Sequence, residues 1–534
     1  MERERYFSAK EFKNIKEIIY NSAKEFANNT AFILKHKNGE KDVTYENITY
    51  QKLLEDINFF GTKMFDLGLK GKRVAIVGRN RYEWVVAHLA NLFGSMLSVP
   101  LDKELQVDEL ESCLVRSKAD VVIFDEKYID NIEEIKQRGN SNLQEYICMS
   151  KKDGYKNFWT LKDEGEELVK KGNNEFINNE VDSYGMSILL FTSGTTSKSK
   201  AVMLSQYGIA ENVYAMLLVE DFRPTDVNLA FLPFHHIFGS TEMIVMLAVG
   251  LATAFPDGLR YVAQNLKEYK VSVFVGVPLL VEAIYKNIEK EIEKQGKTKT
   301  VETAKKISNF LLKFKIDIRK KLFKTIHDAL GGNMRFIISG GAPLDKRVAQ
   351  GFNEIGIELV QGYGLTETAP VIAAENFKKR KFGSIGFPMG NVELEIVNKD
   401  ENGIGEIRVK GPNVMLGYYE NEEATNKVLK DGWFYTGDLA YRDKDGFIFL
   451  TGRQKDMIVL KNGKKVFPDE IETIIKRIDL VKECIVYGMP DVKDKNDLKI
   501  SVKIVYDKQV AEEKYKGKSE EELKKVMRFY DYIE

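Results

Sequence analysis

Short apolar runs rich in β-branched residues alternate with amphipathic helical patterns along most of the chain. Residues 73–78 (RVAIVG) predict a buried strand, residues 82–92 a helix with an apolar face, and residues 96–101 a second strand. Similar apolar runs follow at residues 119–124, 187–191, 271–277 and 334–339. Strand, helix and strand at this spacing predict mostly parallel sheets that are covered by helices.

The pattern changes near residue 386, where short strands separated by turn residues replace the alternation with helices. Expected strands lie at residues 392–397, 405–409 and 446–450. We expect a small antiparallel sheet or distorted β-barrel over about 386–450. After residue 452 the alternation returns, with a helix at 469–477 and a strand at 483–487.

The whole pattern predicts an α/β fold with two domains. A chain of 534 residues is too long for one ordinary hydrophobic core. We expect a large N-terminal domain at 1–452, a hinge at 453–456 and a small, mobile α/β domain at 457–534.

Charge and cysteine content exclude several classes of protein. Lysine plus arginine and aspartate plus glutamate number 80 each, so the chain lacks the positive field that non-specific nucleic-acid binding needs. Cys113, Cys148 and Cys484 have no CxxC spacing, which argues against a disulfide framework or a zinc site and fits a reducing cytoplasm. The first 16 residues do not resemble a signal peptide, and no apolar run reaches the roughly 20 residues of a membrane span.

Residues 305–324 stand apart because they carry eight lysine or arginine residues and a single acid, Asp317. Apolar residues recur near helical spacing between them. A basic amphipathic helix of this kind either packs its apolar face on the core or lies on the inner face of an anionic membrane. The first alternative is the more common one, and the sequence leaves both open.

A segment rich in glycine and hydroxyl side chains, residues 192–200 (TSGTTSKSK), directly follows the apolar run 187–191. Backbone N–H groups, hydroxyls and a terminal lysine can together cradle a phosphate. A polar surface turn has the same composition. The segment is not the GxxxxGK[ST] loop of P-loop ATPases.

The segment resembles the phosphate loop of the adenylate-forming superfamily, which comprises acyl-CoA synthetases, luciferases and the adenylation domains of peptide synthetases. The family pattern is [ST]SGTTGxPKG, and this chain departs from it at Ser197, Ser199 and Ala201. The resemblance implies that the loop binds ATP, with Thr192 also at Mg²⁺. The nucleotide-binding residues implied here are Thr192, Ser193, Gly194, Thr195, Thr196 and Lys200.

Three further segments resemble family motifs in the family's order. Residues 232–239 (LPFHHIFG) match the acyl-pocket segment, with His236 lining the pocket and His235 where an aromatic residue often stands. Residues 339–343 (SGGAP) match the loop under adenine, which implies contacts from Gly341, Ala342 and Pro343. Residues 361–367 (QGYGLTE) match a motif that includes Gly362, Tyr363, Gly364, Thr366 and Glu367. By resemblance Tyr363 stacks on adenine, Thr366 touches the α-phosphate and Glu367 binds Mg²⁺, a hard ion that suits a carboxylate.

Three family matches follow towards the C-terminal end. Residues 431–438 (DGWFYTGD) resemble the segment whose last residue, Asp438, binds the ribose hydroxyls. Residues 451–456 (TGRQKD) resemble the interdomain hinge, with Arg453 at ribose or phosphate and Lys455 as the pivot. Gly463 matches the position in the pantetheine tunnel that tolerates no side chain.

The resemblance, which extends from about residue 26 to 490, implies an acid–thiol ligase that uses ATP, Mg²⁺ and coenzyme A. The catalytic residues would be Lys200, His236, Thr366, Glu367, Arg453 and Lys455. The long insert before Gly331 resembles that of long-chain fatty-acid–CoA ligases. A ligase that loads a carrier protein, one for aryl or amino acids, and a non-catalytic nucleotide- or acyl-binding protein are the alternatives.

One expected element is missing from the sequence. The family uses a lysine near the end of its C-terminal domain, in a P-x-x-x-x-GK context, and this chain reaches Glu534 without that motif. We therefore expect a truncated second domain and weak adenylate formation.

Overall fold

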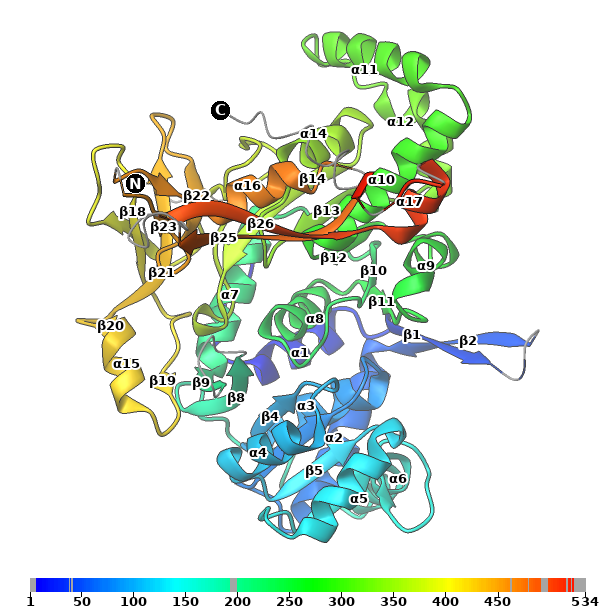
Figure 1. The fold of residues 1–534 in the computed structure, drawn as a ribbon. Coiled ribbons are helices and arrows are strands. Elements are labelled where there is room, and N and C mark those ends of the chain that lie inside the picture. Colours follow the sequence, from blue (N-terminus) through cyan, green and yellow to red (C-terminus); the bar gives the residue numbers. More distant parts are fainter. Residues whose placement is uncertain are drawn as a thin grey trace. The chain divides into compact units, whose positions relative to one another are not determined.

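The computed structural model describes residues 6–37, 39, 42–192, 199–461, 463–478, 480–490, 498–514, 517–519 and 521–522. The chain divides into two units (Figure 1). The first comprises Met1–Ala342, Lys346–Leu394 and Val409–Phe434. The second comprises Pro343–Asp345, Glu395–Arg408 and Tyr435–Glu534. The domain boundary expected at 453 stays a prediction.

An eight-stranded sheet of the first unit has the order β19-β9-β8-β4-β3-β5-β6-β7. Its strands are β3 (Arg73–Val77), β4 (Leu97–Leu101), β5 (Val121–Phe124), β6 (Glu145–Cys148), β7 (Lys156–Asn157), β8 (Met186–Thr192), β9 (Lys200–Ser205) and β19 (Gly417–Tyr418). The strands from β8 to β7 run parallel, whereas β9 is antiparallel to β8 and β19 to β9. Val74–Val77 are fully buried, as expected of a parallel strand covered on both faces.

A nine-stranded sheet has the order β16-β15-β14-β13-β12-β10-β11-β1-β2. Its strands are β1 (Thr30–Lys37), β2 (Val43–Thr49), β10 (Val227–Leu229), β11 (Ala252–Ala254), β12 (Val273–Gly276), β13 (Phe336–Ser339), β14 (Glu358–Gly364), β15 (Val371–Ala374) and β16 (Phe387–Pro388). Its centre is parallel and its two edges are antiparallel. The predicted α/β fold with mostly parallel sheets is confirmed.

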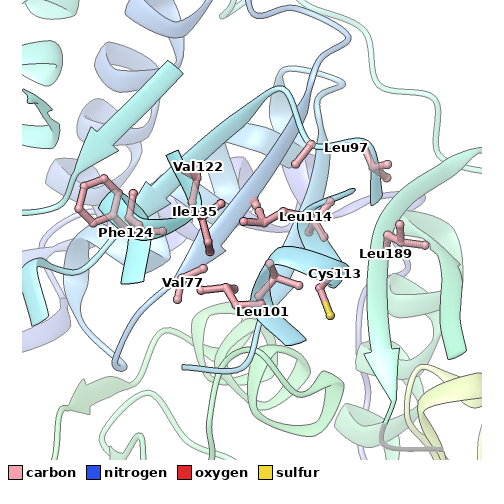
Figure 2. Packing of buried hydrophobic residues seen from close by; sticks show 14 of the residues in the cluster. Val77, Leu97, Leu101, Cys113, Leu114, Val122, Phe124, Ile135 and Leu189 are labelled. Carbon is pink, nitrogen blue, oxygen red and sulfur yellow. The ribbon is translucent and has the colours of Figure 1, made fainter. Parts of the chain in front are cut away.

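Helices surround these sheets. They are α1 (Ile15–Glu25), α2 (Tyr50–Asp66), α3 (Tyr82–Phe93), α4 (Val107–Ser117), α5 (Ile129–Arg138), α6 (Phe158–Lys170), α7 (Gln206–Val219), α8 (Ile237–Val249), α9 (Val262–Glu268), α10 (Pro278–Lys294), α11 (Thr298–Leu312), α12 (Arg319–Leu322), α13 (Lys324–Ala329), α14 (Lys346–Glu354) and α15 (Glu422–Val428). One buried cluster joins Leu114 of α4 and Ile135 of α5 to Val77, Val122 and Phe124 on β3 and β5 (Figure 2). The apolar faces of these two amphipathic helices thus cover one face of the eight-stranded sheet. No helix in the described part of the chain is both long and apolar enough to cross a bilayer.

The prediction of a single helix over 305–324 is wrong. Helix α11 ends at Leu312, and the short helix α12 begins only at Arg319. Lys315 has a left-handed backbone with φ +61°, which interrupts any helix. The Asp317 carboxylate then accepts a hydrogen bond of 3.0 Å from the Arg319 N–H and starts the next turn.

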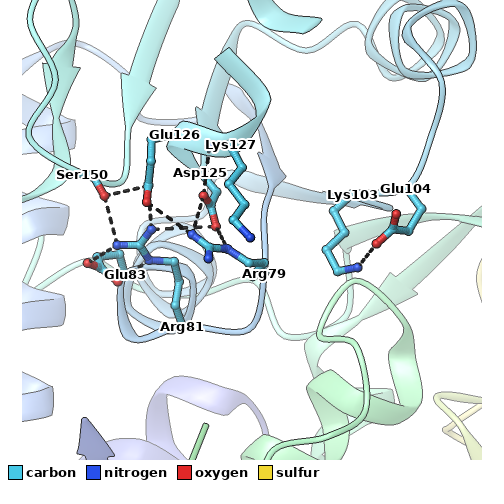
Figure 3. A network of polar contacts seen from close by, with 9 residues as sticks. All are labelled: Arg79, Arg81, Glu83, Lys103, Glu104, Asp125, Glu126, Lys127 and Ser150. Atoms are coloured by element: carbon cyan, nitrogen blue, oxygen red, sulfur yellow. Dashed lines mark hydrogen bonds and ion pairs between the residues drawn. The ribbon is translucent and has the colours of Figure 1, made fainter. Parts of the chain in front are cut away.

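A polar network lies at the carboxyl ends of β3 and β5 (Figure 3). Arg79 makes two hydrogen bonds to the fully buried Asp125, at 2.5 and 2.8 Å. Arg81 pairs with Glu126 at 2.7 Å and with Glu83 at 2.7 Å. Burial would raise the pKa of the Asp125 carboxyl, but the bonds from Arg79 and the Lys127 N–H hold it below its usual value. The network therefore ties two strand ends together beside the edge where ligands bind in α/β sheets.

The β-rich segment forms a five-stranded sheet of order β17-β18-β21-β20, with β22 paired to β21. The strands are β17 (Glu393–Val397), β18 (Gly405–Lys410), β20 (Leu429–Lys430), β21 (Trp433–Arg442) and β22 (Ile448–Arg453). The second unit contains the antiparallel pairs β23 (Ile458–Val459) with β24 (Lys465–Val466) and β25 (Val481–Pro490) with β26 (Leu498–Tyr506). It also contains the helices α16 (Pro468–Ile475) and α17 (Lys508–Lys514). The strand and helix expected after residue 452 are thus present.

Candidate active site

Two antiparallel strands hold the ends of the predicted phosphate loop. Strand β8 ends at Thr192 and β9 begins at Lys200, and these two residues are cross-strand partners. The Thr192 hydroxyl donates a 3.4 Å hydrogen bond to the Lys200 carbonyl oxygen. The predicted loop residues between them, Ser193, Gly194, Thr195 and Thr196, lie outside the described residues.

Ser199, which stands where the family has proline, is fixed by a contact with helix α4. Arg116 donates to both the hydroxyl and the carbonyl oxygen of Ser199, at 3.0 and 2.5 Å. The ring of Phe191 lies under the same guanidinium, 5.1 Å away. The side chain of Arg116 therefore restrains a position that a proline ring would stiffen in the family pattern.

Lys200 and Glu367, predicted from separate motifs, meet at one aromatic ring. The Lys200 ammonium lies 4.6 Å from the centre of the Tyr418 ring, a cation–π contact. The Tyr418 hydroxyl donates a 2.8 Å hydrogen bond to the Glu367 carboxylate. The Met415 N–H donates to the Glu367 carbonyl oxygen at 2.8 Å and fixes the backbone of the glutamate.

Strand β19 carries Tyr418 and pairs with β9 in the register Tyr418 to Val202. Burial raises the pKa of the Tyr418 phenol, and the charge of Glu367 raises it further, so the hydroxyl stays a donor. Tyr418 is not among the residues predicted from the sequence. Its Gly-Tyr-Tyr context predicts at most a short strand and carries no sign of a contact with residue 367.

The motif 361–367 spans the end of β14 and a short 3₁₀ turn. Tyr363 is almost fully buried on β14, and Thr366 and Glu367 begin the turn Thr366–Thr368. Gly364 is required by packing, because a Cβ there would lie 2.0 Å from the Pro370 carbonyl oxygen. No such contact exists at Gly362, where a Cβ would meet its nearest atom at 3.9 Å.

The predicted adenine loop lies beside this motif. Strands β13 and β14 are parallel neighbours in the register Ser339 to Gln361, so the two loops leave the same sheet edge. A Cβ on Gly340 would lie 3.2 Å from the Gly362 carbonyl oxygen, which shows how closely the loops approach. Gly341 has φ +88°, a conformation that favours glycine, and Ala342 follows it. Pro343 groups with the second unit.

The adjacent histidines of the acyl-pocket motif lie together with an aspartate that directly follows β4. His235 Nε2 is 3.2 Å from the Asp102 carboxylate, and the rings of His235 and His236 are 4.3 Å apart. Burial, reinforced by His236, lowers the pKa of His235 to about 4, with Asp102 opposing. Burial also lowers the pKa of His236, so both imidazoles are neutral near pH 7.

Asp102, a second residue outside the predicted motifs, completes a group whose ligand atoms all lie within 4.8 Å of one another. Two imidazoles and a carboxylate suit a transition ion rather than Mg²⁺, which prefers oxygen ligands. Glu367 and Thr192 offer oxygen atoms in the phosphate-loop region. Their chemistry, with the Lys200 ammonium nearby, fits magnesium bound to a polyphosphate.

In the second unit, β21 and β22 place the ribose and hinge residues opposite each other. Asp438 and Arg453 are cross-strand partners, and Arg453 Nε lies 3.2 Å from the Asp438 carboxylate. Asp438 is 6 % exposed, whereas half of the Arg453 side chain is open to solvent. The Asp438 N–H donates to the Thr436 hydroxyl at 3.1 Å, which orients the strand end.

Lys455 and Gly463 occupy the turns that follow. Lys455 is exposed in the turn directly after β22. Gly463 connects β23 to β24 with φ +81°, and a Cβ there would meet nothing within 4 Å. In this arrangement the backbone conformation, rather than a crowded wall, favours glycine at 463.

Relatives by sequence include enzymes that are named for the activation of fatty acids. Fatty acyl-CoA synthetase B of Dictyostelium discoideum is 28% identical over 502 residues, which cover 88% of this chain and 74% of the relative. The chloroplastic long-chain-fatty-acid–[acyl-carrier-protein] ligase AEE15 of Arabidopsis thaliana is 26% identical, and the match covers 90% of this chain and 75% of that relative.

Solved structures with the same fold include the anthranilate CoA ligase AuaEII in complex with anthranoyl-AMP. Its TM-score is 0.74 at 20% identity, and the match covers 98% of this chain and 91% of that chain. The O-succinylbenzoate coenzyme A synthetase of Bacillus subtilis in complex with ATP and magnesium has a TM-score of 0.69 at 22% identity, with 92% and 89% covered.

Two family models match the chain directly. The model of the AMP-binding enzyme matches residues 19–419, and the model of the AMP-binding enzyme C-terminal domain matches residues 455–492. The first match alone spans most of the chain and includes the Lys200, Tyr418 and Glu367 contacts. The chain therefore belongs to the AMP-binding enzyme family and has the fold of adenylate-forming enzymes.

Proposed function

We propose that this protein activates a long-chain fatty acid with ATP as an acyl-adenylate and transfers the acyl group to coenzyme A. The observation that carries the proposal is the contact of Lys200 and Glu367 through Tyr418, at the ends of the phosphate loop of an AMP-binding family member. The names of the sequence relatives support a fatty acid as the substrate.

In the first half-reaction the fatty-acid carboxylate attacks the α-phosphorus of ATP, and pyrophosphate leaves with the electrons of the broken P–O bond. Lys200 and the Thr366 hydroxyl stabilise the negative charge that grows on the phosphoryl oxygens. Glu367 and Thr192 would hold Mg²⁺, which supplies further charge neutralisation when bound. Tyr418 keeps the Glu367 carboxylate aimed at this place through its hydrogen bond.

Further residues of the family motifs would hold the rest of the nucleotide and the acid. Tyr363 and the loop Gly341–Ala342–Pro343 would contact adenine, and the buried Asp438 would accept hydrogen bonds from the ribose hydroxyls. Arg453, which already pairs with Asp438, would add a charged donor at ribose or phosphate. His236 would line the acyl pocket as a neutral imidazole that leaves the fatty-acid carboxylate unpaired and nucleophilic.

For the second half-reaction we propose a rotation about Lys455, within a hinge at 453–456. The exposure of Lys455 in the turn after β22 supports this role, because hinges are commonly a few loop or element-terminal residues that absorb a change of backbone angles. The rotation brings Gly463 to the adenylate, where the coenzyme A thiol attacks the acyl carbon and AMP leaves.

The second candidate is a ligase that loads an acyl carrier protein, because one sequence relative is named for this activity. Both candidates share the first half-reaction. They differ in the thiol that approaches Gly463, which belongs either to free coenzyme A or to the pantetheine arm of a carrier protein.

Acid-dependent AMP formation across fatty acids of increasing length tests the proposal, with acyl-CoA or acylated carrier protein as the product measured. We expect turnover that rises towards the long-chain acids, with coenzyme A as the acceptor. Turnover with aryl acids alone would overturn the substrate class. Acyl transfer only to carrier protein would favour the second candidate.

A further inference from the structure

The segment from α11 to α12 presents an apolar surface that its own unit does not cover. Ile307, Phe310, Phe314, Ile316 and Leu322 have side chains between 42% and 62% exposed. Phe310 and Phe314 contact each other edge to face, with ring centres 5.3 Å apart. Soluble surfaces rarely gather several large exposed apolar side chains, so this cluster marks an interaction site.

The opposite side of the segment is firmly attached to the first unit. Ser308 is fully buried, and Lys305 pairs with Glu302 at 3.1 Å and Glu354 at 3.7 Å. The Arg319 guanidinium donates to the Asn353 carbonyl oxygen and pairs with Glu358 at 3.2 Å. Helix α11 lies beside α10 (Figure 1), with Val301 among the residues that line a cavity between them. The apolar cluster is thus presented to solvent on an anchored support.

Unpaired positive charge surrounds the apolar cluster. Five exposed lysines of the segment form no ion pair within the described parts of the chain, namely Lys306, Lys313, Lys315, Lys320 and Lys321. Lys306 and Lys313 each neighbour a cluster residue, Ile307 and Phe314. By contrast, the lysines and arginines of the buried side have acidic partners.

We propose that this surface, residues 306–322, docks on the anionic face of a lipid bilayer. Aromatic and aliphatic side chains at its centre match the boundary between headgroups and acyl chains, and the lysines match acidic headgroups. A protein partner of equal fit would need an acidic rim around an apolar pocket, whereas a bilayer needs no shape complementarity. The contact is peripheral and reversible, because only a few side chains of one surface enter the headgroup layer.

Co-sedimentation of the purified protein with vesicles tests the docking surface. One vesicle type contains phosphatidylcholine and phosphatidylglycerol at about 7:3, and the other contains phosphatidylcholine alone. We expect at least about tenfold weaker binding to the neutral vesicles, because each lysine near an anionic surface contributes separately. The double variant Phe310→Ser/Phe314→Ser and the triple variant Lys306→Gln/Lys313→Gln/Lys315→Gln should each lose about tenfold in binding to the anionic vesicles.

Matched controls lie on other exposed surfaces. Tyr184 is 60% exposed, so Tyr184→Ser removes an equally open aromatic residue. Lys151→Gln/Lys152→Gln/Lys171→Gln removes three exposed lysines elsewhere. Both controls should bind anionic vesicles like the unaltered protein, and circular dichroism should report the same fold for all variants.

Absent binding to anionic vesicles, or binding that the segment variants leave unchanged, would overturn the proposal. A dimer that the Phe310→Ser/Phe314→Ser variant converts to a monomer would also overturn it and assign the surface to a second copy of the chain. The readout is binding, so it is independent of whether the protein proves to be a fatty-acid ligase.

Discussion

Under the proposed function, Lys200 supplies the positive charge at the end of the phosphate loop. Its ammonium lies against Tyr418, and the hydroxyl of that ring holds Glu367. We expect Lys200→Ala to lower the rate of fatty-acid-dependent ATP–pyrophosphate exchange by about 10² or more, as when one donor to a developing oxyanion is removed.

Lys427→Ala is the control for this substitution, because Lys427 is an exposed lysine of α15 that pairs with Glu423 at 2.6 Å. It should exchange pyrophosphate at the unaltered rate. A Lys200→Ala protein that keeps full exchange activity would remove Lys200 from the active site.

His235 gives a prediction about pH and stability. Its pKa is about 4 in the folded protein, against about 6.5 in an unfolded chain. Below pH 6.5 the His235 imidazole binds a proton in the unfolded chain but not in the folded protein. The free energy of unfolding therefore falls as the pH falls towards 4. Between about pH 6.5 and about pH 5 this one group should lower the free energy of unfolding by about 1.6 kcal/mol, since the full slope of about 1.4 kcal/mol per pH unit applies only once the unfolded imidazole is protonated.

Urea-induced unfolding at the two pH values measures this loss. His235→Asn should reduce the pH-dependent loss by most of that amount. His36→Asn serves as the control, since the His36 side chain is half exposed. Equal pH dependence in the unaltered protein and His235→Asn would contradict a buried neutral imidazole.

Single residues also show where the sequence could and could not predict the site. Thr192, Lys200, Tyr363 and Glu367 belong to contiguous motifs and could be proposed from the sequence alone. Tyr418 and Asp102 come from distant segments, and only the register of β19 on β9 and the end of β4 bring them to the motifs. Cross-strand neighbours of this kind carry no local pattern.

At the scale of elements, the ends of β3 and β5 depend on a charged network rather than on apolar packing alone. Asp125→Asn keeps the hydrogen bond to the Lys127 N–H but removes the charge that Arg79 and Arg81 face. We expect a loss of about 2–3 kcal/mol in the free energy of unfolding, somewhat less than for a fully buried pair because Arg79 is partly exposed.

The ion pair of Arg79 with Asp125 also predicts how stability depends on pH. Since the Asp125 pKa is lowered on folding, its contribution is present above the ordinary value near 4 and is lost as the pH falls below it. Glu104→Gln, which removes the exposed partner of Lys103 (Figure 3), should change stability by less than about 0.5 kcal/mol. Similar small losses for both variants in urea unfolding would contradict the structural role of the network.

Several parallel strands, such as β5 and β12, were predictable because they are short runs of mostly apolar, β-branched residues with a helix before the next strand. The break between α11 and α12 was not, since neither glycine nor proline marks it. Lys315 has a left-handed backbone conformation that prevents α11 from continuing, and the Asp317 carboxylate accepts from the N–H of Arg319, where α12 begins. The spacing of apolar residues in 305–324 is visible in the sequence, but the change of backbone direction between α11 and α12 is not.

At the scale of the molecule, the proposed function gives Gly463 a role in the thiol step alone. We expect Gly463→Leu to keep pyrophosphate exchange within about threefold and to lose at least about tenfold in acyl-CoA formation, because a side chain would obstruct the thiol's approach. Gly403→Leu is the matched control, with φ +76° and equally open surroundings. Equal losses in both half-reactions, or in both variants, would refute a role restricted to the thiol step.

The proposed activity requires that a fatty-acid carboxylate attacks one bound ATP to give an acyl-adenylate. Its most direct test is mass spectrometry of the protein mixed with ATP, Mg²⁺ and hexadecanoate in the absence of coenzyme A, followed by addition of the thiol. We predict a protein-bound hexadecanoyl-AMP with released pyrophosphate, which disappears as hexadecanoyl-CoA and AMP form. Release of ADP and phosphate, or thioester formation without any adenylate, would contradict this activity.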